Sequence, residues 1–130
     1  MSALLLLTLA GVFVTRTAFA RIVLNTINPV ATVSDNGRRV IVMGPIGCDQ
    51  RQRAIVRVTV TQRSTGAVAE GQTFLDCSTT VQQWEIHAFT QGRETFAEGP
   101  ATATALARTA IDRGESDDAH QWLVDITLVR

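Results

Sequence analysis

The sequence predicts an all-β domain: an antiparallel two-sheet β-sandwich of about seven strands, closed by one disulfide. Several segments alternate apolar and polar residues at every second position, as strands with one buried face do. Clusters of Gly, Asn, Asp and Ser separate these segments and are typical of turns. Two cysteines follow a segment that resembles an export signal, which places them where disulfides form.

The clearest strand contains Val56, Val58 and Val60, which face one way while Arg57 and Thr59 face the other. The alanine–threonine segment 101–110 could be helical from its alanine content, but its strict alternation after a Gly-Pro break favours a strand. The expected strands are 31–34, 38–47, 54–62, 67–76, 82–90, 101–110 and 121–129.

One expected strand, 38–47, breaks a rule of β-sheets. It contains Gly44, Pro45 and Gly47, and a proline cannot donate a ladder hydrogen bond. We therefore expect its second half to be bulged, or unpaired along one edge.

Residues 1–20 read as a signal peptide. An apolar run of about twelve residues is too short to span a membrane as a helix. It ends with Ala18 and Ala20 at the −3 and −1 positions of a cleavage site, although no Arg or Lys precedes the run. An uncleaved anchor or a buried strand is the alternative. We expect cleavage after Ala20, an N-terminal segment at 21–30, a domain at 31–130, a secreted or extracellular location, and no membrane contact after cleavage.

In an oxidising compartment, Cys48 and Cys77 most simply pair with each other. A bridge that closes about thirty residues stabilises a fold by about 3.5 kcal/mol in the chain-entropy model. A metal site is the alternative, but neither cysteine has a second Cys or His at ligand spacing.

The composition narrows the range of partners. Twelve basic residues balance twelve acidic ones, which gives no electrostatic reason to expect nucleic acid as a partner. All twelve basic residues are arginine and there is no tyrosine, which we attribute to a GC-rich genome. No cofactor motif stands out.

Several short patterns together resemble the small immunoglobulin-like sandwich domains of secreted proteins from GC-rich bacteria. They are alternating Val40, Val42, Gly44, Ile46 and Cys48, then Thr61-Gln62-Arg63, then Cys77, then Gln83-Trp84, and finally Gly99-Pro100-Ala101. The resemblance covers about residues 31–129 and implies a fold without catalytic residues. Unlike in antibody domains, Trp84 follows both cysteines. The bridge is therefore expected to join strand ends rather than the middle of two sheets.

Catalytic residues are not evident. His87 is expected to point outward on its strand, and His120 follows a polar cluster. No serine lies in a Gly-x-Ser-x-Gly motif, and no His–Asp pair is placed beside one by sequence. We expect a protein that is not an enzyme, with a weak hydrolase as the least favoured alternative.

One acidic cluster could hold Ca²⁺, which prefers carboxylate oxygens. Its candidate ligands are Asp112, Glu115, Asp117 and Asp118. Their spacing does not match the twelve-residue calcium loop, so a solvated loop is the favoured interpretation.

The outward positions suggest an interaction face. If the strands are ordered as in immunoglobulin-like domains, one sheet presents an unusually apolar outer side made of Ile41, Met43, Phe74, His87 and Phe89. Either a partner or second copy binds there, or the apolar segment 21–30 folds over it.

The sequence thus predicts a secreted, non-enzymatic binding or structural module that acts at the cell envelope or outside the cell. Its partner would be an unknown protein or envelope ligand, and a homo-oligomer is compatible with the outer face. The alternative function is a small secreted enzyme inhibitor that uses the loop from Gln91 to Gly99.

Overall fold

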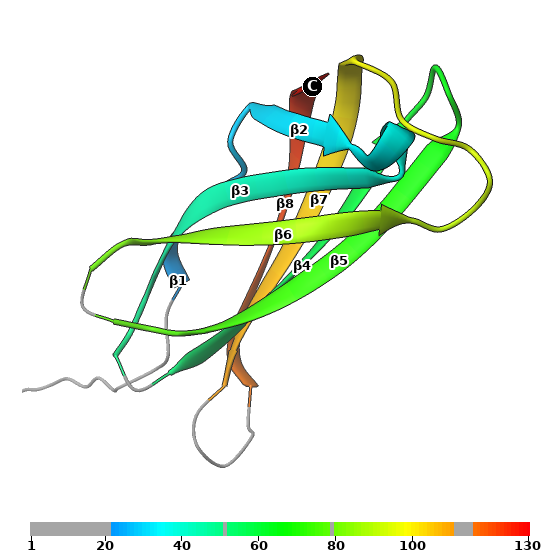
Figure 1. Cartoon of the computed structure of the whole chain (residues 1–130). Helices are drawn as coiled ribbons and strands as arrows, with labels where there is room; N and C mark the ends of the chain where they lie inside the picture. The colour runs from blue at the N-terminus through cyan, green and yellow to red at the C-terminus, as the bar shows by residue number, and fades with distance from the viewer. Residues whose placement is uncertain (1–21, 51, 79, 111–115) are drawn as a thin grey trace, which may run out of the picture.

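The computed structural model describes residues 22–50, 52–78, 80–110 and 116–130. Figure 1 shows the strands as long, twisted arrows around a common core. In chain order the elements of this described part are β1 Ile22–Asn25, β2 Val30–Ser34, the short 3₁₀ turn η1 Asp35–Gly37, β3 Arg39–Cys48, β4 Arg53–Gln62, β5 Ala67–Asp76, β6 Gln82–Thr90, β7 Gly99–Ala110 and β8 Ser116–Val129.

The all-β prediction is confirmed, and each of the seven expected strands is present. Two differences from the prediction exceed two residues. The last strand begins at Ser116, five residues before the expected 121, because it pairs with β7 almost to the end of that strand. The strand β1 was not predicted, since four residues are too few to show an alternating pattern.

The strand pairing forms a closed ring, where an open two-sheet arrangement was predicted. Backbone pairing runs β3-β2-β8-β7-β4-β5-β6 and returns to β3, with β1 added beside the second half of β3. Two short pairings close this ring. One is the parallel pairing of β2 with β8 over Val30–Thr32, and the other joins β5 to β6 at Ala69 and Glu70. By contrast, β4 pairs with β5 along its whole length.

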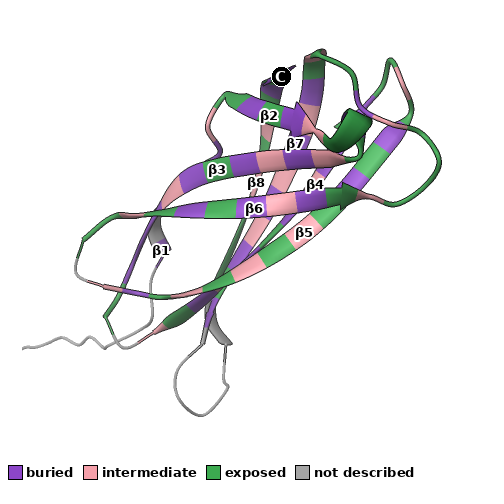
Figure 2. Cartoon of the chain, in the orientation of Figure 1, coloured by how far each residue is buried: buried purple, intermediate pink, exposed green. Residues whose placement is uncertain are grey.

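The core follows from the alternation of the strands, which Figure 2 shows as buried and exposed bands on β3, β4 and β6. Valines of β3 and β4 meet Trp84 and Ile86 of β6, the alanines of β7, and Ile126 and Leu128 of β8. The Trp84 indole N–H donates to the side-chain oxygen of buried Asn25 at 3.0 Å, which gives this buried donor a partner.

The second half of β3 has a neighbour on both edges, so of the two expected alternatives the unpaired edge is wrong, whereas an irregularity is present in its pairing with β1. β6 pairs with β3 through Pro45 and Ile46, while β1 pairs with its other edge, where a register shift lies between Ile22 and Leu24. The Pro45 carbonyl accepts from the Thr26 N–H on the β1 side. Since the nitrogen and oxygen of one strand residue face the same edge, the missing donor of Pro45 does not interrupt pairing with β6.

The predicted disulfide is confirmed. Cys48 at the end of β3 is bonded to Cys77, which follows β5, with their Cα atoms 5.5 Å apart. Both cysteines are buried. The bridge joins strand ends, as expected from the position of Trp84 after both cysteines.

The turn predicted at Asp35-Asn36-Gly37 connects β2 to β3. All three residues have positive φ, with values of 54°, 57° and 85°. A Cβ atom on Gly37 would collide with the backbone oxygen of Phe96. Glycine is therefore required here both by the left-handed backbone and by the close approach of the loop after β6.

The predicted signal peptide at 1–20 lies outside the described residues. In the described part of the chain, no helix is long and apolar enough to cross a membrane.

Candidate functional site

Four of the five residues predicted for an interaction face lie together on the outer side of β3 and β6. The register places Ile41 opposite His87, Met43 opposite Glu85, and Arg39 opposite Phe89. We call these six residues, Arg39, Ile41, Met43, Glu85, His87 and Phe89, the β3–β6 face. They point outward because the intervening residues of both strands fill the core.

The apolar members of this face are partly open to solvent. Phe89 is 51% exposed and Met43 is 37% exposed, while Ile41 is half-buried. Such residues lose water contact when a partner covers them, and each square ångström of apolar surface removed from water contributes about 25 cal/mol. Exposed apolar side chains that share the outer side of a sheet are a feature that a partner can use.

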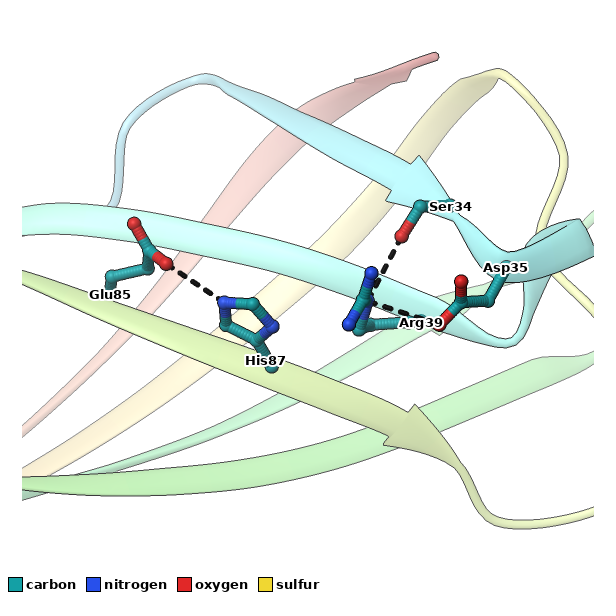
Figure 3. Close-up of polar contacts among 5 residues, drawn as sticks. All are labelled: Ser34, Asp35, Arg39, Glu85 and His87. Carbon is teal, nitrogen blue, oxygen red and sulfur yellow. Dashed lines mark hydrogen bonds and ion pairs between the residues drawn. The ribbon is translucent and has the colours of Figure 1, made fainter.

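The polar members of the face are held by side-chain contacts, shown in Figure 3. His87 Nε2 lies 2.8 Å from Glu85 Oε2. Arg39 Nε donates to Ser34 Oγ at 3.0 Å and lies 3.3 Å from Asp35 Oδ2. Arg39 is thereby tied to the end of β2, so the polar rim is ordered before any partner arrives.

Sequence reasoning missed Arg39 and Glu85 as members of this face. Their positions could have predicted this. Arg39 lies on the same side of its strand as Ile41 and Met43, and Glu85 lies on the same side of its strand as His87 and Phe89.

Phe74 is placed elsewhere. It lies opposite Ile55, because β5 pairs along its length with β4 and meets β6 only at Ala69 and Glu70. Phe74 is 55% exposed and borders a small depression with Arg57 and Arg108. The prediction had assigned β5 to the same sheet as β3 and β6, and the long β4–β5 pairing is why Phe74 does not lie beside the other four residues.

The N-terminal segment does not fold over the face, so that alternative is wrong. β1 pairs edge to edge with β3, and Ile22 and Ile27 are buried in the core rather than laid on the outer side. After β1, the N–H groups of Thr26 and Asn28 bond to the carbonyls of Pro45 and Met43. The segment thus extends the sheet at the edge of β3 and does not cover its outer side.

His87 does not form a catalytic arrangement with a serine among the described residues. His87 is bonded to Glu85, and Ser34, which Figure 3 shows beside this face, is bonded to Arg39. The ring of His120 stacks on Trp122, with centroids 5.4 Å apart. A general base would need a nucleophile within hydrogen-bond reach, and His87 has none among the described residues.

Of the calcium candidates, Asp112 and Glu115 lie outside the described residues, and so do the side chains of Asp117 and Asp118. Among the residues that the structure describes, no three His, Cys, Asp or Glu side chains gather around a common point.

The loop after β6, predicted as an inhibitory segment, is fastened at both ends. The Gln91 N–H donates to Val68 O at 2.8 Å, and Phe96 is buried. The side chain of Gln62 accepts from the Ala97 N–H at 2.9 Å and donates to Ala97 O at 2.9 Å. Only the tip of the loop, residues 92–94, is fully exposed between these anchors.

A larger depression of about 550 Å³ lies at the other end of the β4–β7 pair. Arg63, Ser64, Pro100 to Thr102 and Asp125 line it. It is wide and open, and it does not adjoin the β3–β6 face.

Comparison with known proteins identified little. No protein-family model matches the chain, and no curated protein matches it. Among solved structures, the CooA pilin subunit from enterotoxigenic Escherichia coli superposes with a TM-score of 0.41 at 10% sequence identity. The superposition covers 76% of this chain and 86% of that subunit.

Proposed function

We propose that this protein is a secreted, non-enzymatic binding or structural module that meets a protein or envelope ligand through the β3–β6 face. One observation carries the proposal: Phe89 and Met43 are exposed on the same outer side of two strands that pair with each other, with half-buried Ile41 between them in the register. The ordered contacts of Arg39 and His87 around them supply polar recognition.

The test replaces Met43 and Phe89 with Asp, singly and together. Phe89 is exposed and lies opposite Arg39, so Phe89→Asp should change the free energy of unfolding by no more than about 0.5 kcal/mol. Met43 is 37% exposed and lies opposite Glu85, so Met43→Asp should lower the free energy of unfolding by about 1 kcal/mol and leave the protein folded. Partner capture by the mature protein should fall at least tenfold, which corresponds to about 1.4 kcal/mol. Phe74→Asp is the matched control, since Phe74 is 55% exposed but lies beside β4. Retention of every partner by the double variant would remove the proposal.

We also propose that the ring of strands is an immunoglobulin-like sandwich. Two well-paired groups support this, β1-β3-β6 and β8-β7-β4-β5, because only short pairings link them. The N-terminal region contributes to both groups, because β1 pairs with β3 and β2 pairs with β8. This arrangement fits the same topology. Amide cross-peaks between β5 and β6 limited to Ala69 and Glu70 would support the two-sheet description.

A second function, inhibition of an enzyme by the loop after β6, is favoured by the anchors at Gln91, Phe96 and Ala97. A loop held in one conformation loses little entropy on binding. Arg93 at its exposed tip is the side chain best placed to enter a pocket. A screen against secreted proteases should then find inhibition that Arg93→Ala removes and Met43→Asp leaves intact.

A further inference from the structure

Between Gln121 and Asp125, the strand β8 is paired along only one edge within the described part of the chain. β7 pairs with it from Ser116 to Leu128, whereas β2 pairs with the opposite edge only at Thr127 to Val129. Before Pro29 the chain turns away to follow β3, as the bonds of Asn28 and Thr26 show. Between Gln121 and Asp125, no described residue pairs with this second edge of β8.

The direction of the unpaired groups follows from one hydrogen bond. The Thr127 N–H donates to Pro29 O at 2.8 Å, so Thr127 faces the β2 edge. Its partner on β7 is Pro100, which has no N–H to give, in agreement with this direction. Along a strand without a register shift, the backbone N–H and C=O groups of successive residues point to alternate edges. Gln121, Leu123 and Asp125 therefore point these groups to the same edge as Thr127, which is the open one.

Proteins usually prevent edge pairing with Pro, charged side chains (Lys above all), bulges or very short strands. Residues 121–126 contain one such feature, the charge of Asp125, and the β7–β8 register shift lies away from them at Thr109 and Ala110. Leu123 is 70% exposed, the highest value for a large hydrophobic residue in the described part of the chain. The edge is thus both unpaired and apolar at its centre.

We propose that two copies of the chain pair here, β8 against β8, antiparallel about a two-fold axis at Leu123. In this register Leu123 meets its own copy, and the Gln121 amide meets the Asp125 carboxylate of the other copy. Trp122 of one copy lies opposite Val124 of the other, so apolar residues also face each other on the inner side of the paired strands. A register centred on Asp125 would instead oppose two carboxylates, which is unfavourable.

The self-complementary sequence is what favours a second copy over another partner. Three residues per copy facing the edge would form about six main-chain hydrogen bonds. The interface is independent of the β3–β6 face, because β8 pairs with neither β3 nor β6.

The register can be tested by cysteine cross-linking. In the proposed pair, the two Leu123 Cα atoms would be about 5.5 Å apart, within disulfide reach. The two Gln121 Cα atoms would be four residues out of register, or about 13 Å apart. Mild oxidation should therefore link Leu123→Cys into a covalent dimer and leave Gln121→Cys monomeric. The native cysteines are bonded to each other and buried, so they leave the result unaffected.

Charge substitution tests the same contact without a covalent bond. Wild-type protein should show a concentration-dependent monomer–dimer equilibrium in sedimentation, which Leu123→Asp and Leu123→Arg each weaken at least tenfold. Mixing these two variants should restore the dimer, because opposite charges then meet at the axis. Met43→Asp should dimerise like wild type, which separates this interface from the proposed binding face. A monomeric wild type at all concentrations, equal cross-linking of Gln121→Cys, or loss of the dimer in Met43→Asp would each overturn the proposal.

Discussion

Gln62 is the buried polar side chain whose removal should be most informative about this fold. It is 2% exposed at the end of β4. Its amide nitrogen donates to Ala97 O at 2.9 Å and to Pro100 O at 3.1 Å. Its oxygen accepts from the Ala97 N–H at 2.9 Å and from the Thr65 hydroxyl at 3.0 Å. One side chain thus holds the loop before β7 and the turn after β4.

Gln62→Leu keeps the approximate size and removes all four bonds. Each net hydrogen bond contributes about 1 kcal/mol, and a buried group left without a partner costs more. Thr65 is half-buried and can turn its hydroxyl toward water, so we count the three bonds to the backbone. The free energy of unfolding should fall by about 3 kcal/mol. For a domain of this size, Tm should fall by more than about 10 °C.

The assay is equilibrium unfolding in urea, with hydrogen exchange at single amides. The Ala97 amide should lose protection first, because Gln62 is its acceptor. Gln72→Leu on β5 is the matched control, since Gln72 is exposed and has one long contact of 3.4 Å to Arg57. That variant should change stability by no more than about 0.5 kcal/mol.

Two results would refute the reasoning. Either Gln62→Leu costs no more than Gln72→Leu, or the Ala97 amide keeps its wild-type protection in the Gln62 variant. In both cases, the loop would be held by the burial of Phe96 alone.

Two other predictions concern stability. Replacing Cys48 and Cys77 together with Ser should lower the free energy of unfolding by about 3.5 kcal/mol, because the bridge spans a sequence separation of 29; a loss below about 1 kcal/mol in urea unfolding would contradict the chain-entropy estimate. Gly37→Ala should cost about 2 kcal/mol, since φ is +85° and the added Cβ meets the Phe96 carbonyl. The control is Gly92→Ala, which should be nearly neutral because an added Cβ would lie 3.5 Å from its nearest neighbour. Thermal melting of the two variants beside the wild type measures the difference.

Local pattern was enough to predict seven of the eight strands in the described part of the chain, because a strand shows its buried face as a period of two in its own sequence. Val56, Val58 and Val60 are all fully buried, as their alternation predicted. The Cys48–Cys77 bridge was also predicted by the sequence, because a chain with two cysteines allows a single internal pairing.

The interaction face could be predicted only in part from the same pattern. Ile41, Met43, His87 and Phe89 were predicted as outward residues, and β3 and β6 do present them together. Phe74 was also predicted as outward and is exposed. Its place away from the other four residues could not be predicted, because the sequence of β5 does not determine that β4 is its neighbour.

Only the tertiary structure decided which strands are neighbours, since pairing depends on how distant segments close around one core. It placed β1 on the edge of β3, left one edge of β8 open, and brought Gln62 against Ala97, 35 residues later in the chain. Alternation in sequence determines which way a side chain points from its own strand, whereas its neighbours are determined by long-range packing.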